Sequence, residues 1–115
     1  MVAIGAGAGG LVTALGVAGV GGKSAICEKN LFGGDCLNTG CVPSKALISA
    51  AKHVHNVRQG SKYGITCAGE FKVDFQKVME SIRKKRATIG HHDACDRFIK
   101  DYGIDIFLGH AKFID

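Results

Sequence analysis

The chain has 115 residues, of which 46% are hydrophobic and 22% charged, enough for one domain with an apolar core. This composition excludes a disordered tail, and no uninterrupted apolar run reaches the roughly 18 residues of a spanning helix. The formal net charge of +5 is modest, and we interpret its densest run, residues 83–86, as a solvated helix face. Residues 1–20 are apolar but lack a basic start, which argues against a secretory signal. We therefore expect the cytoplasm, or an organelle matrix if a transit peptide has been removed.

The first elements in chain order form a strand–helix–strand pattern. Residues 2–4 are a short apolar run that predicts a strand, and residues 11–20 space apolar side chains at helical intervals. Residues 23–29 alternate as a second strand does. This order predicts an α/β fold with a parallel sheet.

The loop after the first strand carries the pattern G-x-G-x-x-G, formed by Gly5, Gly7 and Gly10. The first glycine permits a tight turn, the second lets backbone approach a pyrophosphate, and the third allows close helix packing. The helix N-terminus then offers free N–H groups to phosphate. The second strand ends at Glu28, where a carboxylate can accept hydrogen bonds from an adenosine ribose. Together these features predict dinucleotide binding without choosing between FAD and NAD.

Helices and a return to strands are predicted for the rest of the chain. Composition favours a helix over residues 43–58. Asp74 is a good N-cap for a long helical stretch that runs to about Tyr102, with Gly90 as a point of kinking or division. Residues 104–109 and 111–114 are predicted as two short final strands.

Five cysteines are an odd count for a chain without a secretory signal. Cys27, Cys67 and Cys95 stand singly among apolar or helical residues, where cysteine usually acts as a small hydrophobic side chain. Cys36 and Cys41 form a local pair. In a reducing compartment such a pair is more often catalytic or metal-binding than structural.

Three interpretations of this pair are open: a metal clip, a structural disulfide and a redox pair. Residues five apart in a regular helix have Cα atoms about 8.7 Å apart, whereas a disulfide requires roughly 4.4–6.8 Å. A bridged pair therefore needs irregular backbone between the cysteines, which Asn38 and Gly40 tolerate. A zinc site would need two more ligands, and none of the five histidines has a recognisable spacing for that role.

The helix that follows favours the redox interpretation. Pro43 suits its first turn, so the pair lies where the dipole and free N–H groups stabilise a thiolate and lower the cysteine pKa. Lys45 follows Cys41 by four residues, which places its ammonium group on the same helix face. A low-pKa pair beside a dinucleotide loop is typical of a redox centre.

The segments GAGAGG, EK and above all GGDCLNTGCVPSK resemble the FAD-dependent pyridine nucleotide–disulfide oxidoreductases. This family includes dihydrolipoamide dehydrogenase, glutathione reductase and mercuric reductase. The core C-x-x-x-x-C-x-P-x-K is far more specific than the glycine loop, and the resemblance covers the entire chain. The sequence of the motif resembles mercuric reductase-like members most, with dihydrolipoamide dehydrogenase next.

The resemblance implies a role for each site residue. Cys41 would be the flavin-proximal thiol that receives electrons, Cys36 the interchange thiol, and Lys45 a neighbour of the isoalloxazine ring. Electrons would pass from NADH or NADPH through FAD to a disulfide between the two cysteines, then to a disulfide, dithiol or metal-ion substrate. The implied cofactor-binding residues are Gly5, Gly7, Gly10, Glu28, Lys29, Gly34, Asp35, Cys36, Cys41, Lys45 and Ala111.

Family members are several-fold longer, so the resemblance implies that residues 1–115 are a truncated N-terminal part of the FAD/NAD(P)-binding domain. The expected fold is an incomplete Rossmann-like domain with long helices inserted after the second strand. The NAD(P) domain and the dimerisation domain, with its His–Glu acid–base pair, would be absent, so the isolated fragment would be inactive. The parent enzyme would be a homodimer without nucleic-acid or membrane partners. Two alternatives are open: a dihydrolipoamide dehydrogenase- or glutathione reductase-like enzyme, and a non-catalytic dinucleotide-binding fragment.

Overall fold

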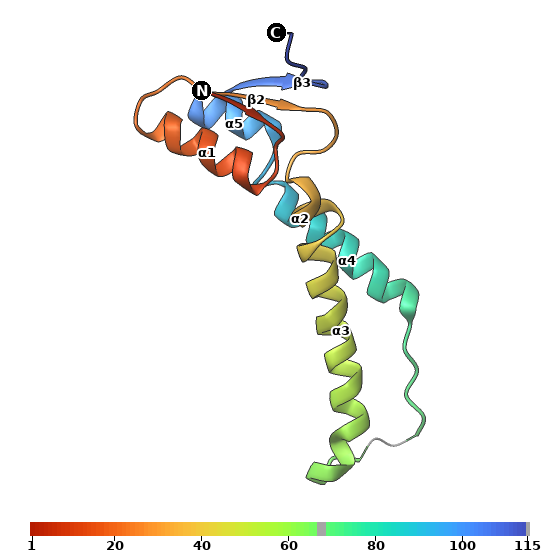
Figure 1. Cartoon of the computed structure of the whole chain (residues 1–115). Helices are drawn as coiled ribbons and strands as arrows, with labels where there is room; N and C mark the ends of the chain where they lie inside the picture. Colours follow the sequence, from red (N-terminus) through yellow and green to blue (C-terminus); the bar gives the residue numbers. More distant parts are fainter. Residues whose placement is uncertain (67–68, 115) are drawn as a thin grey trace.

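The computed structural model describes residues 1–66 and 69–114 and has a three-stranded parallel sheet at one end (Figure 1). The strands β1 (Val2–Ile4), β2 (Ala25–Glu28) and β3 (Asp105–Leu108) lie in the order β1-β2-β3. The register places Ile26 of the central strand between Ala3 and Ile106. The predicted α/β fold with a parallel sheet is confirmed.

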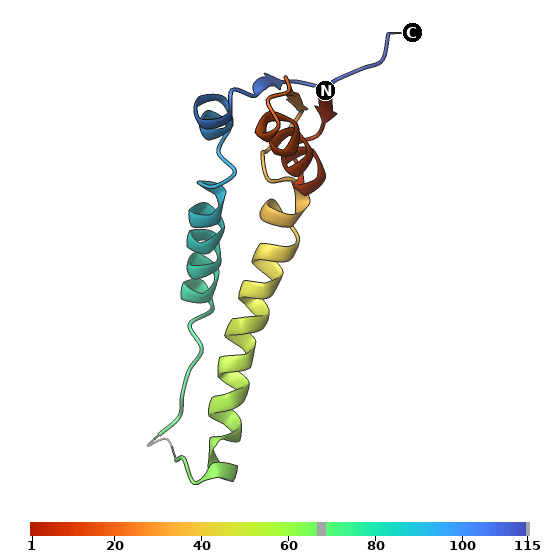
Figure 2. The same cartoon turned by 90° about the vertical axis from the view of Figure 1, so that its left-hand side faces the viewer.

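Helices α1 (Ala8–Gly19) and α5 (Cys95–Tyr102) lie on the same side of this sheet (Figures 1 and 2). Between them and the strands lies a small apolar core, because side chains alternate across each strand and one set faces the helices. On the other face, Val2 of β1 and Phe107 of β3 are more than half exposed. The core consists of Ala6, Leu11, Ala14, Ile26, Phe98 and Ile104.

The long helices come between β2 and β3, as predicted. The short α2 (Gly34–Asn38) leads into α3 (Cys41–Gln59), a 3₁₀ turn η1 (Gly60–Tyr63) and α4 (Phe75–Gly90). Helices α3 and α4 run side by side away from the sheet, so the molecule measures 66 × 28 × 22 Å (Figure 2). In the ranges that the structure describes, every helix is too short or too polar to cross a membrane.

Several predicted element ends are confirmed, and others are shifted by one to three residues. The predicted helix over 43–58 begins two residues earlier, at Cys41, because Gly40 takes the N-cap position. Asp74 caps α4, and its carboxylate accepts a hydrogen bond of 3.1 Å from the N–H of Lys77. Gly90 ends α4, so the predicted division of the long helical stretch is correct.

The prediction of a second final strand over residues 111–114 is wrong. This segment pairs with no strand in the part of the chain that is described, and it leads away from the sheet (Figure 1). Phe113 is 88% and Ile114 95% exposed. An apolar run becomes a strand only beside a neighbour that satisfies its backbone N–H and C=O groups.

Gly10 has the packing role that the glycine pattern predicts for its third glycine. A Cβ atom at this position would collide with the carbonyl oxygen of Gly5 and touch the Cβ of Ala3. The lack of a side chain therefore lets the first turn of α1 press against the turn that follows β1.

We expect Gly10→Ala to lower the free energy of unfolding by about 1–3 kcal/mol, because the new methyl group must displace backbone. Gly9→Ala is a matched control, since nothing lies within 4 Å of its added Cβ atom. That control should be neutral or stabilising by up to about 1 kcal/mol, because alanine favours the helix. Urea denaturation measures both, and equal midpoints for the two variants would contradict the packing role.

Candidate functional site

The glycine turn and the end of β2 are joined by the carboxylate of Glu28. Its Oε2 accepts a hydrogen bond of 2.6 Å from the N–H of Ala6, and its Oε1 accepts one of 2.7 Å from the N–H of Asn30. Gly5 has a φ of +104° and donates its N–H to the carbonyl of Cys27 at 2.8 Å. The carboxylate thus fixes the loops that follow two neighbouring parallel strands.

These bonds also lower the pKa of Glu28. The largest contribution comes from the N–H of Ala6 and the next from the N–H of Asn30, because both donate to the charged form, while burial acts in the opposite direction. The carboxylate is therefore ionised at neutral pH. Each of its oxygens retains a lone pair for a further donor, such as a ribose hydroxyl.

A cavity of about 720 Å³ opens beside this carboxylate. This volume falls in the range of about 300–1,000 Å³ that is typical of small-molecule and cofactor sites. Six of the predicted cofactor-binding residues line it: Gly5, Gly7, Glu28, Lys29, Gly34 and Asp35. Four further lining residues, Asn30, Leu31, Asn38 and Thr39, carried no sequence signal for this role.

The wall of this cavity between the glycine loop and α2 is backbone. A Cβ atom on Gly34 would lie 2.7 Å from the Cα of Gly7, and the N–H of Gly33 donates to the carbonyl of Ala6 at 2.8 Å. Helix α1 begins at Ala8 with no side-chain cap and no acidic residue in its first turn. Its N–H groups and the positive end of its dipole can therefore interact with phosphate.

Cys36 and Cys41 lie on two successive helices instead of one continuous helix. Cys36 is in α2, Cys41 is the first residue of α3, and the N–H of Gly40 between them donates to the carbonyl of Asp35 at 2.6 Å. The predicted irregular backbone between the cysteines is confirmed. Both side chains are exposed thiols.

The predicted lowering of the cysteine pKa is wrong for Cys36. The pKa of this thiol is raised, first by its hydrogen bond with Cys41, then by desolvation and by the charge of Cys41. Lys45 lowers the Cys36 pKa, as expected, but its effect is smaller. The physical reason is that two adjacent sulfur atoms that share a proton resist a second negative charge.

The other predicted site residues lie outside the large cavity. Gly10 packs beneath the glycine loop, and Lys45 lines a groove between α3 and α4. Ala111 is half-buried and does not line the cavity, although the N–H of Gly109, two residues earlier, donates to the carbonyl of Glu28 at 2.8 Å. The structure thus gathers the residues of the glycine loop, β2 and α2, and leaves the C-terminal segment at the margin.

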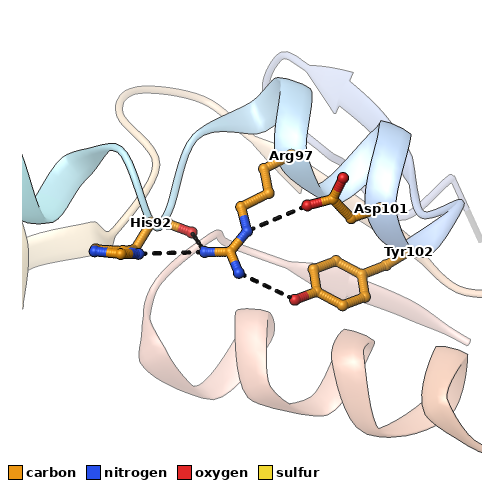
Figure 3. Close-up of polar contacts among 4 residues, drawn as sticks. All are labelled: His92, Arg97, Asp101 and Tyr102. Atoms are coloured by element: carbon orange, nitrogen blue, oxygen red, sulfur yellow. Dashed lines mark hydrogen bonds and ion pairs between the residues drawn. The ribbon is translucent and has the colours of Figure 1, made fainter.

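Cys36 lines a second cavity of about 470 Å³, bordered mainly by α1, α2 and α5. Most of its lining is apolar, including Leu11, Leu15 and Phe98. Arg97 gives it a polar end: its Nη1 lies 3.3 Å from Nδ1 of His92, and its Nη2 donates to the hydroxyl of Tyr102 at 3.4 Å (Figure 3). No sequence pattern indicated a function for these polar residues.

Known proteins match the whole chain. The family model described as pyridine nucleotide-disulphide oxidoreductase matches residues 1–115. A dihydrolipoyl dehydrogenase of Chlamydia muridarum is 37% identical over 113 residues, which are 98% of this chain and 24% of that protein. Dihydrolipoyl dehydrogenases of Bacillus subtilis and Geobacillus stearothermophilus are 40% and 39% identical over 115 residues, 97% of this chain and 23% of each protein. The chain therefore spans about a quarter of the length of these curated relatives.

The bonds to Glu28 predict an acid-dependent contribution to stability. Because the folded pKa is lowered, this contribution is fully present above the ordinary pKa of about 4.3 and is lost as the pH falls through the folded pKa. We expect Glu28→Gln to lower the free energy of unfolding at pH 7 by about 1–3 kcal/mol, with a smaller loss below pH 4.

Denaturation with urea at pH 7 and at a series of acidic pH values measures this difference. Glu70→Gln, which removes an exposed carboxylate, is the control. A difference between Glu28→Gln and the parent that stays constant with pH would contradict the assignment.

Proposed function

Because the chain belongs to the pyridine nucleotide-disulphide oxidoreductase family, we propose that it forms the N-terminal part of a FAD-dependent disulfide oxidoreductase. Membership in this family implies FAD and NAD(P)H as cofactors. One observation carries the proposal: α2 borders both cavities. Gly34, Asp35 and Asn38 line the larger one, whereas Cys36 and Leu37 line the smaller one. A redox-active helix between a cofactor and its substrate requires this arrangement.

The residues of the larger cavity fit FAD. The backbone of Gly5, Gly7 and Gly34 leaves room for a pyrophosphate at the N-terminus of α1, and Glu28 can accept hydrogen bonds from ribose hydroxyls. When bound, FAD supplies two-electron transfer between NAD(P)H and a disulfide. In this proposal Lys29 lies beside Glu28 at the ribose end of the cofactor, Asp35 lies along its ribityl and phosphate path, and Lys45 lies near the isoalloxazine ring.

The two cysteines have different roles: Cys36 attacks the substrate, and Cys41 resolves the mixed disulfide. Reduction breaks the sulfur–sulfur bond between Cys36 and Cys41, and the two sulfur atoms take up two electrons and two protons. The Cys36 thiolate then attacks one sulfur of the substrate disulfide, whose other sulfur leaves and takes a proton. Cys41 attacks the mixed disulfide, which re-forms the internal bond and releases the second substrate thiol. When the same steps run in reverse, they oxidise a dithiol substrate.

The raised pKa of Cys36 has a consequence for this chemistry. A thiolate is the attacking species, so a thiol with a raised pKa needs a base to remove its proton. We assign this role to the His–Glu pair that the family resemblance implies, on the dimerisation domain of a longer, homodimeric parent protein. Residues 1–115 would then supply the dithiol and the greater part of the FAD site.

The choice of substrate rests on the relatives and on the smaller cavity. The relatives reported above are named dihydrolipoyl dehydrogenase, which favours a dithiol of that kind over the metal ion of a mercuric reductase-like enzyme. The largely apolar lining beside Cys36 also suits a ligand with a hydrocarbon chain. The alternative of a non-catalytic dinucleotide-binding module requires only the larger cavity and treats the cysteines as incidental.

We predict that Gly7→Ala weakens FAD binding by about ten- to a hundredfold, because the methyl group occupies space needed by the pyrophosphate. The fold should tolerate this change, since the new Cβ atom would have the Cα of Gly34 at an ordinary contact distance of 3.9 Å. Titration monitored by flavin fluorescence measures the affinity. Gly9→Ala, two residues further along in α1, is the control, and equal affinities for the two variants would disprove the assigned pyrophosphate position.

The redox role is tested by an absorbance spectrum of the FAD-loaded protein during stepwise reduction with dithionite. We expect a long-wavelength band after two electrons, because the thiolate of Cys41 then lies against the flavin. Cys41→Ser should abolish the band, and the control Cys27→Ser should retain it. Cys36→Ser has no disulfide to reduce, so it should show the band before any electron is added and lose it when two electrons reduce the flavin. Identical spectra for the parent and the Cys41→Ser variant would favour the non-catalytic module.

A further inference from the structure

One member of the basic run at residues 83–86 contacts the redox segment. The Nη1 of Arg86, on α4, donates a hydrogen bond of 3.1 Å to the carbonyl of Asn38, the last residue of α2. Within residues 1–66 and 69–114, the side chains of Arg83, Lys84 and Lys85 form no ion pair and no hydrogen bond. All four residues are exposed, as the interpretation of a solvated helix face predicts, and Arg86 in addition makes this one hydrogen bond.

Asn38 itself is the junction of several bonds. Its Nδ2 donates to the carbonyl of Phe32 at 3.0 Å and to the carbonyl of Gly34 at 2.9 Å, so both of its amide hydrogens are used. These bonds tie the end of α2 to the chain that enters it. The bond from Arg86 then ties the same residue to α4, which lies 48 residues further along the chain.

The residue before Asn38 also lies beside α4. Leu37 is only 6% exposed, and it is near enough to Gly90, the last residue of α4, that a Cβ atom added to Gly90 would lie 3.7 Å from its Cδ2. Helix α4 therefore lies beside two successive residues of α2 and is hydrogen-bonded to the second. These residues lie between Cys36 and Cys41.

We infer that Arg86 is a positioning residue for the cysteine pair, acting through the carbonyl of Asn38. The inference rests on the proposed redox function. A disulfide requires Cα atoms roughly 4.4–6.8 Å apart, so closing the bond must restrict the backbone between the two cysteines. Restricting that backbone in advance reduces the conformational entropy lost on closure. Without Arg86 the end of α2 has more freedom, and the disulfide becomes easier to reduce.

The dithiol–disulfide equilibrium of the protein against dithiothreitol tests this inference. The two thiols of dithiothreitol are oxidised to its cyclic disulfide, and their electrons and protons convert the bond between Cys36 and Cys41 to two thiols. We expect Arg86→Ala to shift this equilibrium about three- to tenfold toward the dithiol, the usual effect of one hydrogen bond. Arg86→Lys, which keeps one donor, should give a smaller shift.

Arg83→Ala is the matched control, because it removes the same charge from an exposed position on the same helix. It should leave the equilibrium within about twofold of the parent. Asn38→Asp, which removes the two amide donors without changing the shape of the side chain, should shift the equilibrium in the same direction as Arg86→Ala. Thermal unfolding of each variant reports its overall stability separately.

The inference would be overturned if Arg86→Ala and Arg83→Ala had the same dithiol–disulfide equilibrium. This holds even if Arg86→Ala lowers the melting temperature, because Arg86 would then stabilise the fold without positioning the cysteines. The proposed function would survive that result. If the protein without substitutions forms no disulfide between Cys36 and Cys41 at any ratio of reduced to oxidised dithiothreitol, the proposed function is overturned, and this inference with it.

Discussion

The carboxylate of Glu28 accepts hydrogen bonds from the backbone of Ala6 and of Asn30, and the geometry of the larger cavity depends on these two bonds. An ionised group that is only 7% exposed is costly unless donors compensate it. Here the donors belong to the loops after β1 and β2, so the compensation also fixes both loops. The turn at Gly5 and the start of α1 follow from this arrangement. A cofactor that binds at this edge of the sheet meets a wall that is already in place.

Helix α2 has only five residues, but it borders both cavities. One face borders the larger cavity and the other carries Cys36 toward the smaller one. Two glycines allow α2 to border both cavities. Gly34, its first residue, lies against Gly7, and the backbone at Gly40 separates α2 from α3. A single continuous helix would hold the two sulfur atoms too far apart for a disulfide. The break in the helix is therefore a requirement of the disulfide chemistry that we propose.

The long pair of helices that extends from the sheet is connected to the site at its base. Helix α4 is hydrogen-bonded through Arg86 to the end of α2, so the segment between the cysteines is supported from a distant part of the chain. The raised pKa of Cys36 has a local origin in the neighbouring thiol. Helix α4 thus supports the backbone between the cysteines, whereas the neighbouring thiol of Cys41 determines the direction of the Cys36 pKa shift.

The sequence alone determined the features that depend on local backbone chemistry. The glycine loop, Asp74 as a cap, the division at Gly90 and the break between the cysteines follow from residues that favour or forbid a conformation within a few positions. The resemblance to the family also lies in a short run of neighbouring residues, the cysteine motif. Gly5, Gly7 and Glu28 of the larger cavity were also predictable, since the ends of neighbouring parallel strands meet at one edge of the sheet. Lys29, Gly34 and Asp35 were expected there only from the family resemblance.

Only the tertiary structure decided which distant groups meet. It brought Arg86 to Asn38 and Arg97 to the cavity of Cys36, and it left residues 111–114 without a neighbouring strand. It also reversed the expected pKa shift of Cys36, because the position of a second thiol outweighed the charge of Lys45. Hydrogen bonds and electrostatic interactions depend on distances in space, and a sequence pattern fixes such distances only between near neighbours along the chain.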